Sequence, residues 1–203
     1  MLATTDAIVL ALQKHSDKAH ILHAYTRAGG RVNYMVYGLG RKHPAGLYTP
    51  LSLVQLTAAY PPAASSRPPV LKEATLLSGP QHAVPSVTRQ TVALFVSEVL
   101  YHVLRHPMPD ETMFDFLALS AQQLGETDEP QNFHIAFLTG FAAQLGFAIP
   151  ETAEGISPLA AGTPHTREER QHRLQKLCAY YAEHVETWQN PKSLDVLTEV
   201  FDS

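Results

Sequence analysis

A change of hydrophobic pattern near residue 79 limits the possible folds of this chain more than any other feature. Before this point short apolar runs are separated by Gly and Pro, and after it apolar residues recur at helical spacing. The stretch Gly79 to Ser86 contains two prolines and continues neither pattern. We therefore expect an α+β protein with two domains, residues 1–78 and 79–203.

The first domain contains five predicted strands. They lie at residues 7–12, 18–26, 31–38, 48–60 and 70–77, and the sequence Ala28-Gly29-Gly30 predicts a tight turn between the second and third. Alternation in the third strand places Tyr34 on the same face as Val32 and Val36 and predicts that it lies in the core. Five short strands favour a small barrel, and the OB-fold is the common five-stranded barrel that binds oligonucleotides.

The second domain is predicted to be entirely helical. The expected helices cover residues 88–105, 110–124, 132–147 and 193–201, together with one that begins at a capping box formed by Thr166 and Glu169. Residues 132–147 are apolar almost all round, so this helix is expected at the centre of the domain.

Charge is distributed unevenly between the two parts. Residues 1–78 carry 8 Lys and Arg against 3 Asp and Glu, a net of +5, whereas residues 79–203 carry 7 against 16, a net of −9. A local positive field on an acidic protein indicates that the basic part meets a polyanionic ligand.

The basic part has the residue types that bind nucleic acid. Lysine and arginine at strand ends can reach phosphates, tyrosine faces can stack on bases, and Gly38 and Gly40 allow close approach of a backbone. The alternatives are that Tyr37 lies in the core and that the cations only solvate the surface. The candidate DNA-binding residues are Lys14, Arg27, Arg31, Tyr37, Arg41 and Lys42.

A second basic group, Arg170, Arg173 and Lys176, steps along one helix of the acidic part. Ordinary surface charge, offset by Glu168 and Glu169, explains such a group. Alternatively, a cationic edge beside an apolar face suits an acidic peptide that ends in a hydrophobic residue. These three residues are the candidate partner-binding site.

Catalytic and metal motifs receive no support. The sequence GLGRK lacks the Ser or Thr that follows the lysine of a phosphate loop, since His43 follows Lys42. His102 and His106 could share a metal on one helix, but no third ligand is evident and a surface pair is favoured. We expect no catalytic residue, no metal, no cofactor and no enzymatic activity.

The longest apolar run, Ala7 to Leu12, is too short to span a membrane, and one cysteine, Cys178, excludes an internal disulfide. No signal peptide is evident. The expected location is therefore the cytoplasm.

The order of several segments carries a resemblance. The chain reads AIVL, HAYTRAGGRVNYMVYGLGRK, LYTPLSLVQL, LFVSEVLYHVL, NFHIAFLTGFAAQLGF, LCAYYAEH and KSLDVLTEVF. In this order the segments resemble the bacterial RecO family of recombination mediators, in the form found among Bacteroidetes-like bacteria. The resemblance implies an N-terminal OB-fold and a C-terminal helical domain. It also implies binding and annealing of DNA.

The resemblance further implies partners and a location. The implied partners are single- and double-stranded DNA, RecR during loading of RecA, and the C-terminal tail of single-stranded-DNA-binding protein, all at the nucleoid. Some relatives hold zinc with four cysteines, which Cys178 alone cannot do. Residues 151–165 also look shorter than the corresponding stretch in relatives.

The sequence thus predicts a non-catalytic, DNA-binding recombination mediator that acts in DNA repair. Two alternatives stay open: an RNA-binding OB-fold protein with a helical adaptor domain, and a small-molecule enzyme whose site is not visible in the sequence.

Overall fold

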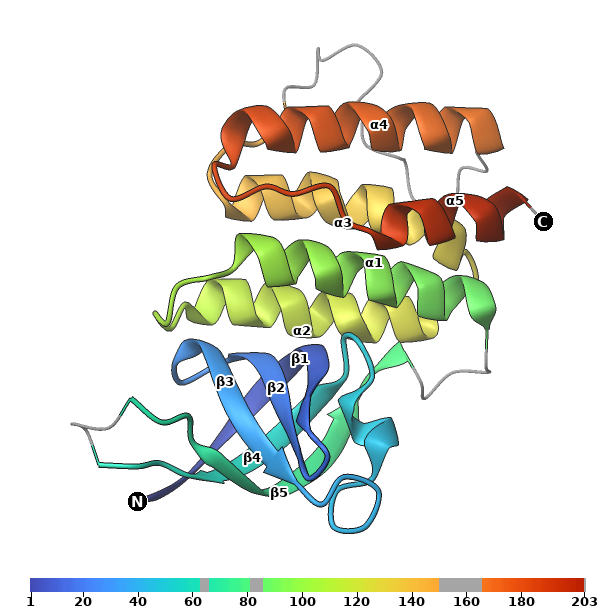
Figure 1. Ribbon diagram of the computed structural model, residues 1–203. Helices are drawn as coiled ribbons and strands as arrows, with labels where there is room; N and C mark the ends of the chain where they lie inside the picture. The colour runs from blue at the N-terminus through green and yellow to red at the C-terminus, as the bar shows by residue number, and fades with distance from the viewer. Residues whose placement is uncertain (63–65, 81–85, 150–165, 203) are drawn as a thin grey trace. The chain divides into compact units, whose positions relative to one another are not determined.

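A computed structural model describes residues 1–62, 66–80, 86–149 and 166–202 of the chain. Its first part is a closed five-stranded barrel, drawn from blue to green in Figure 1. The strands are β1 (Leu2–Ser16), β2 (Ala19–Thr26), β3 (Gly30–Tyr37), β4 (Leu53–Ala59) and β5 (Val70–Ser78). Their order around the barrel is β1-β2-β3-β5-β4, so the predicted OB-fold barrel is confirmed.

The first strand is longer than the apolar run that predicts it. Its N-terminal half pairs with β4, from Leu2 opposite Ala59 to Ile8 opposite Leu53. Its C-terminal half pairs with β2, from Ala7 opposite Thr26 to Ser16 opposite Ala19. Because β1 pairs with a different strand along each half, it extends beyond its buried segment at both ends. The apolar run therefore covers only its middle.

The fourth strand begins later than expected. Residues Ala45–Tyr48 form a short 3₁₀ helix, and β4 begins only at Leu53. Pro50 lies between them and has no N–H group to give to a sheet ladder. The predicted strand at 48–60 is therefore correct only in its second half.

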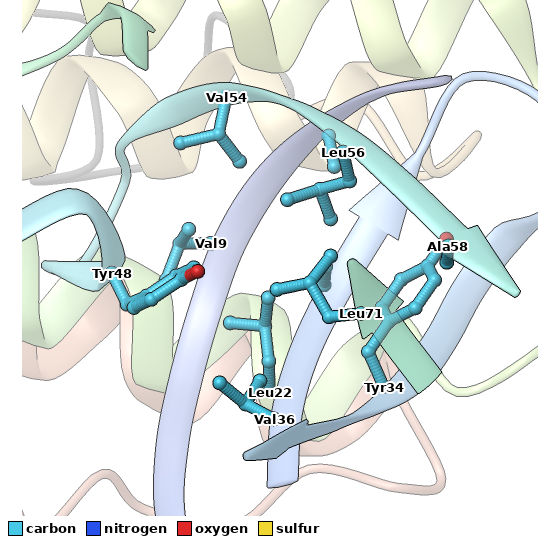
Figure 2. Close-up of a cluster of buried hydrophobic side chains, with 11 residues drawn as sticks. Val9, Leu22, Tyr34, Val36, Tyr48, Val54, Leu56, Ala58 and Leu71 are labelled. Atoms are coloured by element: carbon cyan, nitrogen blue, oxygen red, sulfur yellow. The ribbon is translucent and has the colours of Figure 1, made fainter. Parts of the chain in front are cut away.

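The barrel interior is filled by alternate residues of all five strands. Figure 2 shows this cluster, in which Tyr34 is fully buried. The hydroxyl of Tyr34 shares a hydrogen bond of 3.0 Å with that of Tyr60, so its polar end is satisfied. The prediction that Tyr34 belongs to the core is confirmed.

Among the described residues, five α-helices follow the barrel: α1 (Val87–Val103), α2 (Glu111–Glu126), α3 (Pro130–Gln144), α4 (Arg167–His184) and α5 (Ser193–Asp202). The predicted capping box of α4 is confirmed, because Glu169 N–H donates to Thr166 Oγ1 and Thr166 N–H donates to Glu169 Oε2. Helix α3 ends before Gly146, whose φ of +87° favours glycine.

The helices do not all belong to one unit. One compact unit comprises Met1–Val84 and Leu104–Glu126, and the other comprises Pro85–Val103 and Thr127–Ser203. Residues 104–126, including α2, therefore group with the barrel, although the sequence places them with the other helices. The last strand does end at Ser78, where the sequence places the end of the barrel segment.

Within the second unit, α1 contacts both α3 and α5, and α3 contacts α4. Aromatic rings join the last pair of helices, since Phe141 stacks on Tyr181 with their ring centres 6.2 Å apart. The Gly-, Ala- and Pro-rich stretch that looks shorter than in relatives, residues 151–165, lies outside the described residues.

Candidate nucleic-acid interface

One end of the barrel collects most of the candidate DNA-binding residues. We call it the loop end, and it consists of residues 14–20 and 37–43. The turn between β1 and β2 closes where Ser16 lies opposite Ala19, and β3 brings Tyr37 opposite Ala19. Strand register therefore places the turn beside the loop that follows β3 (Figure 1). Together they surround a recess of about 360 Å³ lined by Asp17, Lys18, His20, Tyr37, Gly38, Leu39 and Arg41.

The loop after β3 has a defined backbone. Gly38 and Gly40 have φ values of +75° and +84°, which residues with side chains rarely adopt. The N–H groups of Arg41 and Lys42 both donate to the carbonyl oxygen of Gly38, at 3.1 and 2.9 Å. The two glycines thus allow a tight turn that presents Arg41 and Lys42 next to each other.

His43 anchors this loop to the barrel unit. It is 4% exposed, and its Nδ1 shares a hydrogen bond of 3.0 Å with the hydroxyl of Tyr48. Burial, with the nearby charge of Lys42, lowers the pKa of His43, so the ring is neutral at pH 7. Burial also raises the pKa of Tyr48 to about 12, which keeps its hydroxyl protonated.

The loop end is positively charged. Lys18, Arg41 and Lys42 are exposed, and none of them forms an ion pair within the part of the chain that the structure describes. Lys14 pairs with Asp17 at 3.0 Å and keeps 67% of its side chain exposed. Exposed cations that are not engaged in ion pairs retain their attraction for phosphates.

Arg27 and Arg31 lie at the other end of the same strands. We call it the hairpin end, residues 26–31, where Thr26 lies opposite Gly30. Strand β2 has eight residues, and at about 3.3 Å per residue this separates the two ends by roughly 25 Å. The six candidates therefore do not form one surface.

Both arginines of the hairpin end contact residues between positions 104 and 115. Arg27 forms an ion pair of 2.6 Å with Asp115, and its guanidinium lies 4.4 Å from the ring centre of Phe114. The Arg31 side chain donates to the carbonyl oxygen of Leu104, at 3.4 Å. These two candidates contact protein groups, and only Lys14, Tyr37, Arg41 and Lys42 gather at the loop end.

The three tyrosines of β2 and β3 differ in how much of each side chain is exposed. Tyr25 and Tyr34 are 4% and 0% exposed, whereas Tyr37 is 49% exposed and lines the recess. Only Tyr37 of these three can offer a ring face to a base. Sequence reasoning did not single out His20 as part of this site, because its neighbours in the recess come from another strand.

The candidate partner-binding residues Arg170, Arg173 and Lys176 are all half-buried on α4. A small cavity of about 20 Å³ lies beside Arg170, lined also by His134, Arg167, Gln171, Leu174, Leu197 and Thr198. Burial and the charge of Arg170 lower the pKa of His134 to about 3, so it is neutral. His134 and the α5 residues are missing from the sequence prediction, since packing of three helices brings them together.

The possible histidine metal pair does not form on a helix. Helix α1 ends at Val103, so His106 lies beyond it, and His102 instead lies 3.8 Å from Glu98. In the described ranges no three metal-ligating side chains come together. Cys178 is buried, which raises its pKa to about 11 and disfavours a reactive thiolate.

Comparison with known proteins agrees with this architecture. The family model "Recombination protein O N terminal" matches residues 1–65, and "Recombination protein O C terminal" matches residues 85–188. The chain belongs to the RecO family. The family resemblance noted in the sequence is thereby confirmed. Its Bacteroidetes-like form agrees with the organisms of the relatives described next.

Relatives described as "DNA repair protein RecO" align along almost the whole chain. The Porphyromonas gingivalis protein is 29% identical and covers 100% of both chains. Those of Christiangramia forsetii and Flavobacterium psychrophilum are 26% and 27% identical, covering 99% and 97% of this RecO-family chain and 100% and 98% of their own. Family membership and the barrel support a role in DNA repair. None of the described helices combines the length and apolar character needed to cross a bilayer.

Proposed function

We propose that this RecO-family chain is a non-catalytic recombination mediator that binds single- and double-stranded DNA through the loop end of its barrel. The observation that carries the proposal is the group of exposed cations Lys18, Arg41 and Lys42 beside the half-exposed Tyr37. Cations bind the phosphates of any sequence, and an exposed ring adds stacking on bases. The protein works at the nucleoid in the cytoplasm.

Annealing of complementary strands follows from the same surface. Phosphate contacts neutralise the charge of each strand without covering the base edges that must pair. The relatives named above are described as DNA repair proteins. On the resemblance noted in the sequence, this chain also cooperates with RecR in loading the recombinase RecA.

The test is the salt dependence of oligonucleotide binding. Replacing Arg41 and Lys42 with alanine should weaken binding to all sequences about equally, and should lower the slope of log affinity against log salt by about 0.7 to 0.9 for each phosphate that the protein no longer neutralises. The matched control is Lys72→Ala, which removes an exposed cation from β5. An unchanged slope in the double variant would place the interface elsewhere.

The second part of the proposal concerns the helical unit. Arg170, Arg173 and Lys176 form a cationic edge that receives the acidic C-terminal tail of single-stranded-DNA-binding protein. The support is the position of Arg170 beside the apolar side chains of Leu174 and Leu197, which line the small cavity described above. Cations beside an apolar surface suit a carboxylate next to a hydrophobic side chain.

A further inference from the structure

The recess at the loop end is large enough for an organic group. Its volume of about 360 Å³ lies within the roughly 300–1,000 Å³ of small-molecule sites and far above the roughly 30 Å³ that one water occupies. Phosphates bound to surface lysines need no such recess. Its size therefore favours a ligand group beyond the sugar-phosphate backbone.

The walls of the recess suit the edge and the face of a nucleobase. Tyr37 supplies an aromatic ring that is 49% exposed. His20 also lines the recess, and because it lies opposite Val36, a core residue, its side chain is on the inner face of the sheet. The polar side chains of Asp17, Lys18 and Arg41 also line the recess. They can exchange hydrogen bonds with the edge of a base.

The charged side chains around the recess favour a base over a phosphate as the inserted group. Asp17 brings a carboxylate to the wall, where it repels a phosphate but can accept a hydrogen bond from a base N–H group. Lys18 and Arg41 also line the recess, and the Lys42 side chain packs over Gly38, where an added Cβ would be 3.7 Å from the lysine Cγ. The cations are thus placed to hold phosphates on either side of an inserted base.

We propose that this recess seats one unstacked nucleobase of a single DNA strand against the Tyr37 ring. The inference rests on the proposed function that the loop end binds DNA, and it adds that the contact includes a base. A base inside a duplex is stacked and paired, so the recess recognises unpaired DNA only. The same surface then holds duplex DNA through its cations alone.

The experiment compares three probes of equal length: a deoxythymidine oligonucleotide, the same backbone without bases, and a duplex. The native protein should bind the deoxythymidine oligonucleotide roughly 5- to 150-fold more tightly than the abasic one, the range expected for stacking of one base. Tyr37→Ala should lose most of this difference, because it weakens binding of the deoxythymidine oligonucleotide more than binding of the abasic strand or the duplex. Tyr37→Phe keeps the ring and should behave like the native protein.

Equal affinity of the native protein for the base-bearing and abasic strands would overturn this inference and leave the proposed function standing. Equal weakening of all three probes by Tyr37→Ala would overturn it as well. Absence of binding to every probe would instead overturn the proposed function. Replacing both Arg41 and Lys42 with alanine should weaken all three probes, which distinguishes the phosphate contacts from the base contact.

Discussion

Arg27 shows how the surroundings of one residue decide its role. Its guanidinium lies 4.4 Å from the ring centre of Phe114, and Asp115 accepts its hydrogen bond at 2.6 Å. A cation held by a ring and a carboxylate of its own chain has less attraction left for a phosphate. We therefore expect Arg27 to stabilise the barrel unit instead of contacting DNA.

Replacement of Arg27 by alanine should lower the free energy of unfolding by about 1–2 kcal/mol, the combined worth of a partly exposed ion pair and a cation–π contact. Chemical denaturation measures this decrease. The salt slope of DNA binding should stay at its native value, in contrast to the Arg41 and Lys42 double variant. A reduced slope would return Arg27 to the DNA interface.

At the scale of elements, α5 is attached to α1 through one carboxylate. Glu98 accepts hydrogen bonds from the N–H groups of Lys192 and Ser193, both at 2.9 Å, and from the Ser193 hydroxyl at 2.6 Å. Burial opposes the charge of Glu98, but these bonds and nearby His102 hold its pKa below the usual 4.5. The ionised carboxylate is thus the form that binds the start of α5.

The change Glu98→Gln should cost about 1–2 kcal/mol of stability at pH 7, since it weakens hydrogen bonds to a charged acceptor. A carboxyl group with a lowered pKa stabilises the fold above its unfolded pKa and loses that effect as the pH falls through the folded pKa. The difference between variant and native protein should therefore shrink below about pH 4.5. Thermal unfolding across this range measures it, with exposed Glu183→Gln as control.

Helix α3 carries a row of stacked rings. Phe137 is 4% exposed and lies 6.1 Å from Phe133 and 5.5 Å from Phe141 between ring centres. Replacing Phe137 with alanine should cost about 3–5 kcal/mol, because the cavity removes both burial and packing. A melting temperature within a degree or so of the native value would show that α3 is not central to its unit.

At the scale of the whole molecule, the compact units distribute charge differently from the linear sequence. Residues 1–84 and 104–126 carry 9 Lys and Arg against 7 Asp and Glu, a net of +2 in place of the +5 of residues 1–78. The added acids include Asp110 and Asp115, which lie near Tyr25 and Arg27 of the barrel. The positive field is thereby reduced around the hairpin end and remains at the loop end.

Because the proposed DNA surface and the proposed peptide surface lie on different units, a substitution at one should leave binding at the other largely intact. Charge reversal of Arg170 and Arg173 to Glu should abolish binding of an acidic tail peptide that ends in phenylalanine, while most oligonucleotide affinity remains. Because Arg170 borders buried His134, a second variant with Arg173 and Lys176 reversed tests the edge with less disturbance of packing. Titration of labelled peptide and oligonucleotide measures both, and full peptide affinity in both variants would place the pocket elsewhere.

Local patterns in the chain identified most of the elements and the faces that they bury. Alternation in β3 identified Tyr34 as a core residue, and the spacing of Thr166 and Glu169 identified the start of α4. These features depend on residues a few positions apart, and local periodicity reports such relations directly. The family resemblance likewise needed only the order of segments along the chain.

Tertiary structure alone decided which of these elements meet. Strand register separated Arg27 and Arg31 from Arg41 and Lys42, and packing assigned α2 to the barrel unit. The recess likewise combines His20 of β2 with Tyr37 of β3, and the cavity beside Arg170 combines residues of α3, α4 and α5. Such contacts join residues distant in sequence, and their free energy depends on the complete fold, so no local pattern contains them.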